Sequence, residues 1–257
     1  DEVIIPTPYW VSYGDQVKMA EGVPVFVQAK EDNHFKVTVE QLEAARTDKT
    51  KVLVLNSPSN PTGMIYSREE LMAIGNWAVA HDVLILADDI YGRLVYNGNE
   101  FVPISSLSEA IRKQTIVING VSKAYAMTGW RVGYAVGNPE IIAAMSKLTG
   151  QTTSNLTAVS QYATIEALTG PQDSVETMRQ AFEERLNTIY PLLCQVPGFE
   201  VVKPQGAFYL FPNVKKAMEM KGYTDVTDFT TAILEEVGLA LITGAGFGAP
   251  ENVRLSY

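Results

Sequence analysis

Residues 115–134 read TIVINGVSKAYAMTGWRVGY, a strand-like run followed by two cations in a glycine-rich segment. The run Thr115–Asn119 is apolar on both faces, as expected of a strand that helices cover on two sides. Lys123 comes just after this run, and Arg131 follows eight positions later. Functional side chains of α/β domains gather just past the carboxyl ends of the strands. The stretch therefore predicts an α/β fold with a candidate site at one edge of its sheet.

Other short apolar runs alternate with amphipathic helical patterns in the first part of the chain. The runs are Val3–Ile5, Val23–Val27, Val52–Leu55, Val83–Ala87 and Val132–Val136. Helices are predicted at Glu40–Ala45, after the capping box Ser67-Arg68-Glu69-Glu70, and at Pro139–Lys147. This alternation is typical of an α/β domain with a mostly parallel sheet.

The pattern changes after Gly170-Pro171, where smaller elements follow a long helix. The predicted elements are a helix at Val175–Leu193, strands at Phe199–Val202 and Gly206–Phe211, a helix at Val226–Val237 and a strand at Leu239–Thr243. We therefore expect a large domain at residues 1–171 and a smaller α+β domain at residues 172–257.

Composition narrows the classes of partner. The 257 residues carry a net charge of −9 without a long basic run, which makes nucleic acid and anionic membranes poor partners. No apolar run is long enough to span a membrane. The only cysteine, Cys194, excludes an internal disulfide, is expected to be buried on a helix, and fits a cytoplasmic protein. His34 and His81 lie far apart without acidic neighbours at ligand spacing, so no metal site is predicted.

Two strands end in polar residues that could carry chemistry. Val52–Leu55 runs into NSPSNPTG at 56–63, which is either a rigid turn before a helix or a loop that holds the Asn60 amide toward a ligand. Asp88 follows the run Val83–Ala87, where a carboxylate is costly unless it is paired. It either caps a helix or faces a cation or a protonated nitrogen, with Tyr91 donating a hydrogen bond nearby.

The two cations of the opening stretch also allow two interpretations each. Lys123 either extends its ammonium to solvent or is desolvated, which lowers its pKa and makes it a nucleophile or base. Arg131 either forms a structural salt bridge or binds a phosphate or carboxylate in a bidentate manner. Together with Asp88, Tyr91 and Asn60, these groups fit pyridoxal phosphate, whose aldehyde reacts with a lysine and whose ring nitrogen pairs with a carboxylate.

With these residues in place, the sequence resembles the class I aminotransferases of the fold-type I pyridoxal-phosphate enzymes, and most of all their bacterial aspartate aminotransferase branch. The matching stretches are PYWVSY (8–13), NSPSNPTG (56–63), ADDIY (87–91), SKAYAMTGWRVGY (122–134), GAFYLF (206–211) and VRLSY (253–257). The resemblance implies a mostly parallel, seven-stranded type of sheet with helices on both faces, incomplete here, plus a smaller α+β C-terminal domain.

The resemblance also implies catalytic roles. Lys123 is joined to the cofactor and shuttles a proton between the substrate's α-carbon and the cofactor. Asp88 pairs with the pyridine nitrogen and keeps it protonated. Tyr91 and Asn60 bond the ring oxygen.

Further binding residues follow by resemblance. Trp10 stacks on the cofactor ring beside the substrate, and Arg131 binds the phosphate, with Ser122 as an additional cofactor contact. Arg254 binds the substrate's α-carboxylate in a bidentate pair, and Asn60 contributes to the same binding site.

The implied activity is ping-pong transamination by a homodimer, with aspartate or a related amino acid as donor and 2-oxoglutarate as acceptor. Three alternatives stay open: a β-lyase or other elimination enzyme, an aromatic or alanine aminotransferase, and a non-catalytic effector-binding domain. The complete set of functional groups favours catalysis over a structural remnant.

The sequence departs from the family pattern in two respects. Relative to the family it resembles, we expect it to be truncated at both ends, without the glycine-rich phosphate loop. Some relatives carry a serine three residues before the lysine, where this chain has Gly120. We therefore expect these residues alone to bind the cofactor weakly or not at all. The family's rigid turns imply cis peptide bonds before Pro8 and Pro61.

Overall fold

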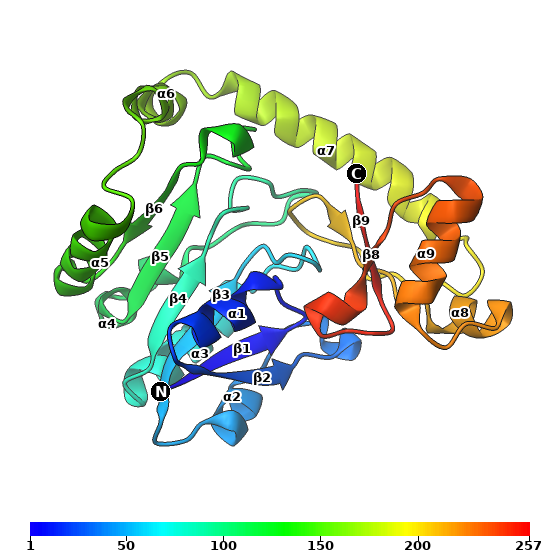
Figure 1. The fold of residues 1–257 in the computed structure, drawn as a ribbon, viewed down its shortest axis with the longest axis horizontal. Helices are drawn as coiled ribbons and strands as arrows, with labels where there is room; N and C mark the ends of the chain where they lie inside the picture. Colours follow the sequence, from blue (N-terminus) through cyan, green and yellow to red (C-terminus); the bar gives the residue numbers. More distant parts are fainter.

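Two β-sheets and the helices around them make up the fold (Figure 1). The computed structural model describes residues 1–257. The larger sheet has six strands in the order β2-β1-β3-β4-β5-β6, and the smaller has three in the order β7-β9-β8. The strands are β1 (Glu2–Thr7), β2 (Val23–Gln28), β3 (Thr50–Asn56), β4 (Leu84–Asp88), β5 (Thr115–Gly120), β6 (Gly133–Val136), β7 (Tyr209–Leu210), β8 (Ile242–Thr243) and β9 (Val253–Ser256).

Nine α-helices connect these strands. They are α1 (Ser12–Met19), α2 (Val39–Ala45), α3 (Arg68–Ala80), α4 (Glu109–Lys113), α5 (Pro139–Thr152), α6 (Ala158–Thr169), α7 (Asp173–Leu193), α8 (Lys215–Lys221) and α9 (Val226–Val237). Reciprocal capping boxes start α2 at Thr38 and α3 at Ser67, which satisfies main-chain donors that the helices leave free. None of the helices combines the length and the apolarity needed to cross a membrane.

The register of the larger sheet positions the candidate site. Strands β1 to β5 run parallel, and β6 alone pairs antiparallel, with β5. Asn56 at the end of β3 is paired with Asp88 at the end of β4, and Asp88 is paired with Ile118 of β5. The segments that follow these three strands therefore start side by side at one edge of the sheet.

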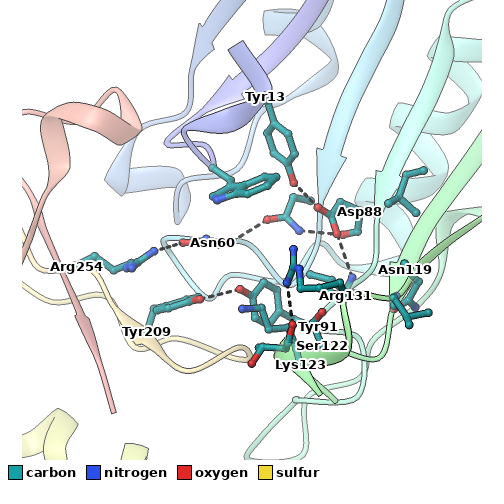
Figure 2. Close-up of a pocket in the computed structure, with 18 residues that line it drawn as sticks. Tyr13, Asn60, Asp88, Tyr91, Asn119, Ser122, Lys123, Arg131, Tyr209 and Arg254 are labelled. Carbon is teal, nitrogen blue, oxygen red and sulfur yellow. Dashed lines mark hydrogen bonds between the residues drawn. The ribbon is translucent and has the colours of Figure 1, made fainter. Parts of the chain in front are cut away.

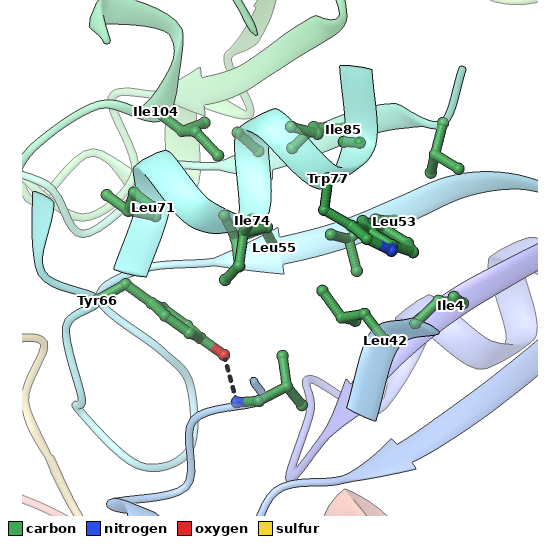
Figure 3. Close-up of a cluster of buried hydrophobic side chains, with 14 of the residues drawn as sticks. Ile4, Leu42, Leu53, Leu55, Tyr66, Leu71, Ile74, Trp77, Ile85 and Ile104 are labelled. Atoms are coloured by element: carbon green, nitrogen blue, oxygen red, sulfur yellow. Dashed lines mark hydrogen bonds between the residues drawn. The ribbon is translucent and has the colours of Figure 1, made fainter. Parts of the chain in front are cut away.

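The main core lies between this sheet and the helices on one of its faces (Figure 3). Alternate strand residues point to this face, where they pack against α2, α3 and α4; they are Ile4, Leu53, Leu55, Ile85 and Ala87. The residues between them point to the other face, where Ile5 and Val54 pack against Tyr13 of α1. Burial of the core therefore also anchors the helix that carries Tyr13.

Most of the predicted elements of the first part are confirmed. All six predicted strands are present, and the predicted helices correspond to α2, α3 and α5. The helices α1, α4 and α6 were not predicted. Burial on both faces holds for most of β3, whereas Ile118 and Asn119 of β5 are only half-buried because they border an open cavity.

The second part contains less sheet than predicted. Phe199–Val202 is not a strand, because its only pairing is an isolated bridge from Glu200 to Asn213. Within the other predicted strands only β7 and β8 form, while the predicted long helix and the helix at Val226–Val237 are confirmed as α7 and α9. Cys194 is exposed rather than buried, because its neighbour Leu193 takes the buried position at the end of α7. The domain division at residues 171 and 172 stays a prediction.

A substitution in the main core tests the packing of α3 on the sheet. Ile74 is 1% exposed, so Ile74→Ala should lower the free energy of unfolding by about 2–5 kcal/mol through lost burial and a residual cavity. Val79→Ala on the same helix is the control, since Val79 is 37% exposed and should cost less than about 1 kcal/mol. Urea unfolding measures both, and equal effects would contradict the described core.

Candidate active site

A cavity of about 560 Å³ opens at the carboxyl edge of the larger sheet (Figure 2). Its walls come from the start of α1, from the segments after β3, β4 and β5, and from β7 and β9 of the smaller sheet. All eight candidate residues line it: Trp10, Asn60, Asp88, Tyr91, Ser122, Lys123, Arg131 and Arg254. The fold thus brings together residues that are spread along the whole chain.

The carboxylate of Asp88 is held by hydrogen bonds at the end of β4. The Tyr13 hydroxyl donates to Oδ2 at 2.6 Å, and the main-chain N–H of Ile90 donates to Oδ1 at 3.2 Å. Burial raises the pKa of Asp88, while these two hydrogen bonds and the nearby Lys123 act in the opposite direction. The net effect raises the pKa of Asp88, so a cationic partner in the cavity would favour the ionised carboxylate.

Lys123 lies half-buried at the opposite side of the cavity. Burial is the largest cause that lowers its pKa, and the positive charges of Arg254 and Arg131 lower it further. Its Nζ lies 5.9 Å from the centroid of the Tyr91 ring and 5.7 Å from that of the Phe208 ring. The desolvated interpretation of Lys123 thus agrees with the geometry, since the amine is in the cavity rather than extended into solvent.

The loop after β3 is tied to the neighbouring strand and to the smaller sheet. The Asn56 amide donates to the main-chain oxygen of Asp88 at 2.9 Å, and its Oδ1 accepts from the main-chain N–H of Asn60 at 2.8 Å. Asn60 in turn accepts from Arg254 Nη1 at 2.9 Å through its own Oδ1. The loop is therefore held as a rigid support for the Asn60 amide.

Arg254 combines fixed geometry with an unused donor. Its guanidinium carbon lies 4.5 Å from the centroid of the Tyr209 ring and 5.1 Å from that of Phe247, so two aromatic rings hold it. Its Nε is buried without a hydrogen-bond partner. A buried, unpaired guanidinium donor is costly, and a carboxylate ligand would satisfy it.

The hydroxyl groups of Tyr91 and Tyr209 form a further pair. Their oxygens lie 2.7 Å apart, and both side chains are buried. Burial is the largest cause that raises the pKa of each hydroxyl, which keeps both protonated at neutral pH. Tyr91 thus presents a protonated hydroxyl at the cavity wall.

The remaining candidates lie at the more open side of the cavity. Arg131 is exposed, has a left-handed backbone with φ of 56°, and donates to the main-chain oxygen of Thr128 at 2.9 Å. Trp10 is 37% exposed and packs edge-on against Tyr13. At Gly120 a Cβ would lie 2.7 Å from the main-chain oxygen of Val132, just before β6, so this backbone leaves no room for a side chain there.

Two of the three cis peptide bonds were expected. They precede Pro8 and Pro61, as the resemblance implied, and a third precedes Pro58.

Three further cavity residues hold the candidate residues in place but were not assigned from the sequence, although the quoted motifs contain all of them. Tyr13 ends PYWVSY, Asn56 begins NSPSNPTG and Tyr209 lies in GAFYLF. The contacts of Tyr13 and Tyr209, and that of Asn56 with Asp88, join residues distant in sequence, so residue type and spacing carry no signal for them.

The match to a known protein family covers the whole chain. Residues 1–257 match the family model described as aminotransferase class I and II. The chain belongs to this family. The larger parallel sheet with its antiparallel β6 and the small antiparallel sheet thereby confirm the aminotransferase fold class that the sequence predicted.

Individual aminotransferases agree with this assignment. The chain is 79% identical to an asparagine–oxo-acid transaminase of Streptococcus mutans and 60% identical to an aspartate aminotransferase of Geobacillus stearothermophilus, in each case over all 257 residues. A solved aspartate aminotransferase of Thermus thermophilus with maleate is 38% identical, with a TM-score of 0.93 over the whole chain and 65% of that structure. The chain spans about 65% of the length of the two curated relatives.

The hydrogen bond from Tyr13 gives a first prediction for this site. Tyr13→Phe removes a donor to the Asp88 carboxylate, so the pKa of Asp88 should rise by about one to two units. Carbon-detected NMR titration of the carboxyl group measures the change. Tyr162→Phe is the control, since Tyr162 is 75% exposed. An unchanged pKa in Tyr13→Phe would show that the bond does not stabilise the carboxylate.

The neighbouring Asp89 gives a second prediction. It is 6% exposed, and burial together with the Asp88 charge raises its pKa to about 7. A carboxyl whose pKa is raised on folding stabilises the fold below its unfolded pKa, and this contribution is lost as the pH rises through about 7. Asp89→Asn should therefore be more stable than the wild type at pH 8, by about 2–4 kcal/mol, with a smaller difference at pH 5.

Thermal or urea unfolding of the 257-residue chain at the two pH values measures this difference. Asp48→Asn serves as the exposed control and should change stability little at either pH. A pH-independent gain in Asp89→Asn would contradict the raised pKa.

Proposed function

We propose that these residues form the catalytic part of a pyridoxal-phosphate-dependent aminotransferase, which moves an amino group from an L-amino acid to a 2-oxo acid in a ping-pong reaction. One observation carries the proposal. A lysine with a lowered pKa, a buried carboxylate and an arginine with a free donor border the same cavity; they are Lys123, Asp88 and Arg254. Membership of the aminotransferase family supports it.

The donor set fits pyridoxal phosphate in charge and in hydrogen-bonding type. Lys123 offers an amine for the aldehyde, Asp88 an anionic oxygen for a protonated ring nitrogen, and Tyr91 a hydroxyl for the ring oxygen. Arg131 and Ser122 offer donors for the phosphate. When bound, the cofactor supplies an electron sink for the charge that remains on the substrate's α-carbon after its proton leaves.

We assign the proton transfer to Lys123 Nζ. Because burial and two neighbouring arginines lower its pKa, a larger share of the amine is neutral and able to accept a proton near neutral pH. The Tyr91 and Phe208 rings keep Nζ on the inner wall of the cavity. Nζ would accept the proton from the substrate's α-carbon and could donate it again, so Lys123 would act first as base and then as acid.

We assign substrate orientation to Arg254. Asn60 already occupies Nη1, so the buried Nε and the remaining guanidinium N–H groups are free for the substrate's α-carboxylate. The rings of Tyr209 and Phe247 hold the guanidinium plane. A substrate fixed there by its carboxylate would present its α-carbon toward Lys123.

Asp88, supported by Tyr13, would keep a negative charge beside the cofactor's ring nitrogen during the reaction. The Tyr13 hydroxyl and the Ile90 N–H stabilise the carboxylate of Asp88 against the effect of its burial. An ionised Asp88 favours a protonated ring nitrogen by direct charge interaction. Trp10 would provide a flat apolar surface at the mouth of the cavity.

For the substrate, we propose aspartate or asparagine as donor and 2-oxoglutarate as acceptor. The names of the two curated relatives, an asparagine–oxo-acid transaminase and an aspartate aminotransferase, support this class. The free donors of Arg254 account for the carboxylate that both amino acids share. A homodimeric, cytoplasmic enzyme is also proposed, on the family resemblance alone.

Replacing the lysine tests the proposal. In the complete gene product, Lys123→Ala should lower the rate of the half-reaction with aspartate or asparagine by at least about a hundredfold, because it removes the group that moves the proton. Stopped-flow absorbance of the protein loaded with pyridoxal phosphate measures the rate. Lys147→Ala, on the exposed side of α5, is the control and should retain the wild-type rate.

Analysis of the products that the wild-type protein forms distinguishes the competing functions. Amino transfer to 2-oxoglutarate supports the proposal. Release of pyruvate or ammonia from cystathionine without amino transfer would identify a β-lyase. Ligand binding without turnover would identify an effector-binding protein. Wild-type rates in Lys123→Ala would overturn the assignment of the lysine.

A further inference from the structure

Tyr209 contacts two residues of the candidate site, Tyr91 after β4 of the larger sheet and Arg254 on β9 of the smaller sheet. It lies on β7, where its pairing partner on β9 is Ser256. Because alternate residues of a strand point to the same face, Arg254 is the diagonal neighbour of Tyr209 across this pair. Tyr209 is 4% exposed, so its position is fixed by packing.

The hydroxyl of Tyr209 points away from the smaller sheet and reaches Tyr91, as Figure 2 shows. The two oxygens lie 2.7 Å apart, and Tyr91 belongs to the segment that follows β4. A phenolic oxygen donates one hydrogen bond and accepts others. When Tyr91 donates to a ligand oxygen, its own oxygen can accept from Tyr209, which strengthens Tyr91 as a donor.

The ring of Tyr209 acts on a different group. Its centroid lies 4.5 Å from the guanidinium carbon of Arg254, closer than the 5.1 Å of Phe247 on the same guanidinium. The contact is a buried cation–π interaction, which fixes the plane of the guanidinium. Arg254 therefore depends on the Tyr209 ring for its orientation, and Tyr91 depends on the Tyr209 hydroxyl.

We propose that Tyr209 is a positioning residue with two separable functions: its ring orients Arg254 for a carboxylate, and its hydroxyl directs the Tyr91 proton toward the ring oxygen of the cofactor. The proposal rests on the proposed function for its second half. It assigns a role to a residue that touches neither reacting atom. The ring function requires only Arg254 and an anion, so it can be measured without cofactor.

Three variants separate the two functions. Tyr209→Phe keeps the ring and removes the hydroxyl. Phe247→Leu removes the other ring from Arg254 and leaves the pair of tyrosines intact. Tyr209→Leu removes both the ring and the hydroxyl while keeping an apolar side chain.

Two measurements on the complete gene product report on the two functions. The first is the dissociation constant of maleate, a dicarboxylate, on the cofactor-free protein, measured by NMR or calorimetry. The second is the pH midpoint of the absorbance change of the protein loaded with pyridoxal phosphate. A weaker donor to the ring oxygen stabilises its anionic form less, so the midpoint should rise.

For Tyr209→Phe we expect the pH midpoint to rise by about half a unit to one unit, which is the shift that the loss of one hydrogen bond corresponds to. The maleate affinity of this variant should stay within about twofold of the wild type. For Phe247→Leu we expect the opposite pattern, an unmoved midpoint and maleate binding weaker by about threefold to thirtyfold. Tyr209→Leu should show both changes. Thermal unfolding of each variant confirms that it is folded.

An unmoved midpoint in Tyr209→Phe would overturn the hydroxyl function, and wild-type maleate affinity in Tyr209→Leu would overturn the ring function. Failure of the proposed function has a different signature. In that case the wild-type protein itself shows no pH-dependent absorbance with pyridoxal phosphate. The hydroxyl function then falls with it, while the maleate measurement still decides the ring function.

Discussion

The parallel register of β3 and β4 is the constraint on which the candidate site depends. It pairs Asn56 with Asp88, so one amide side chain can bond the end of the neighbouring strand and also hold the main chain of Asn60. From Asn60 the connection continues to Arg254 on the smaller sheet. A shift of one residue in this register would turn every side chain of the strand to the other face and separate these groups. Backbone pairing deep in the sheet thus sets the geometry at its edge.

The adjacent aspartates at the end of β4, Asp88 and Asp89, have different surroundings, and these affect their pKa values differently. Asp88 accepts hydrogen bonds from a hydroxyl and a main-chain N–H, which offset part of the rise in pKa that its burial causes. Asp89 is as well buried, but only burial and the neighbouring negative charge act on it, and both raise its pKa. The difference comes from strand alternation, which directs one carboxyl toward the cavity and α1 and the other away from them. Burial raises the pKa of both carboxyl groups, but only at Asp88 do hydrogen bonds and a nearby cation oppose the rise.

The sequence was sufficient for the fold class and for all six strands of the larger sheet, because short apolar runs and capping boxes are local signals. The eight candidate residues also came from local signals, namely polar groups after strands and the family motifs. Tyr13 and Tyr209 could not be found in this way. Their partners, Asp88 and Tyr91, lie 75 and 118 residues away in sequence, so only the tertiary structure reveals the contacts. The strand predicted at Phe199–Val202 failed for a related reason: its residues favour a strand, but no extended partner lies beside them.

The bond between Arg254 and Asn60 joins residues that are 194 positions apart, and it closes the cavity between the two sheets. Contacts of such long sequence separation slow folding, because the loop must close before they can form. Asp88 and Lys123 belong to the first part of the chain, yet their cavity lacks a wall until β9 is in place. A chain in which β9 has not docked would therefore hold Lys123 in a more open cavity, where burial lowers its pKa less. The contribution of Arg254 to the lowered pKa of Lys123 is therefore absent until β9 has docked.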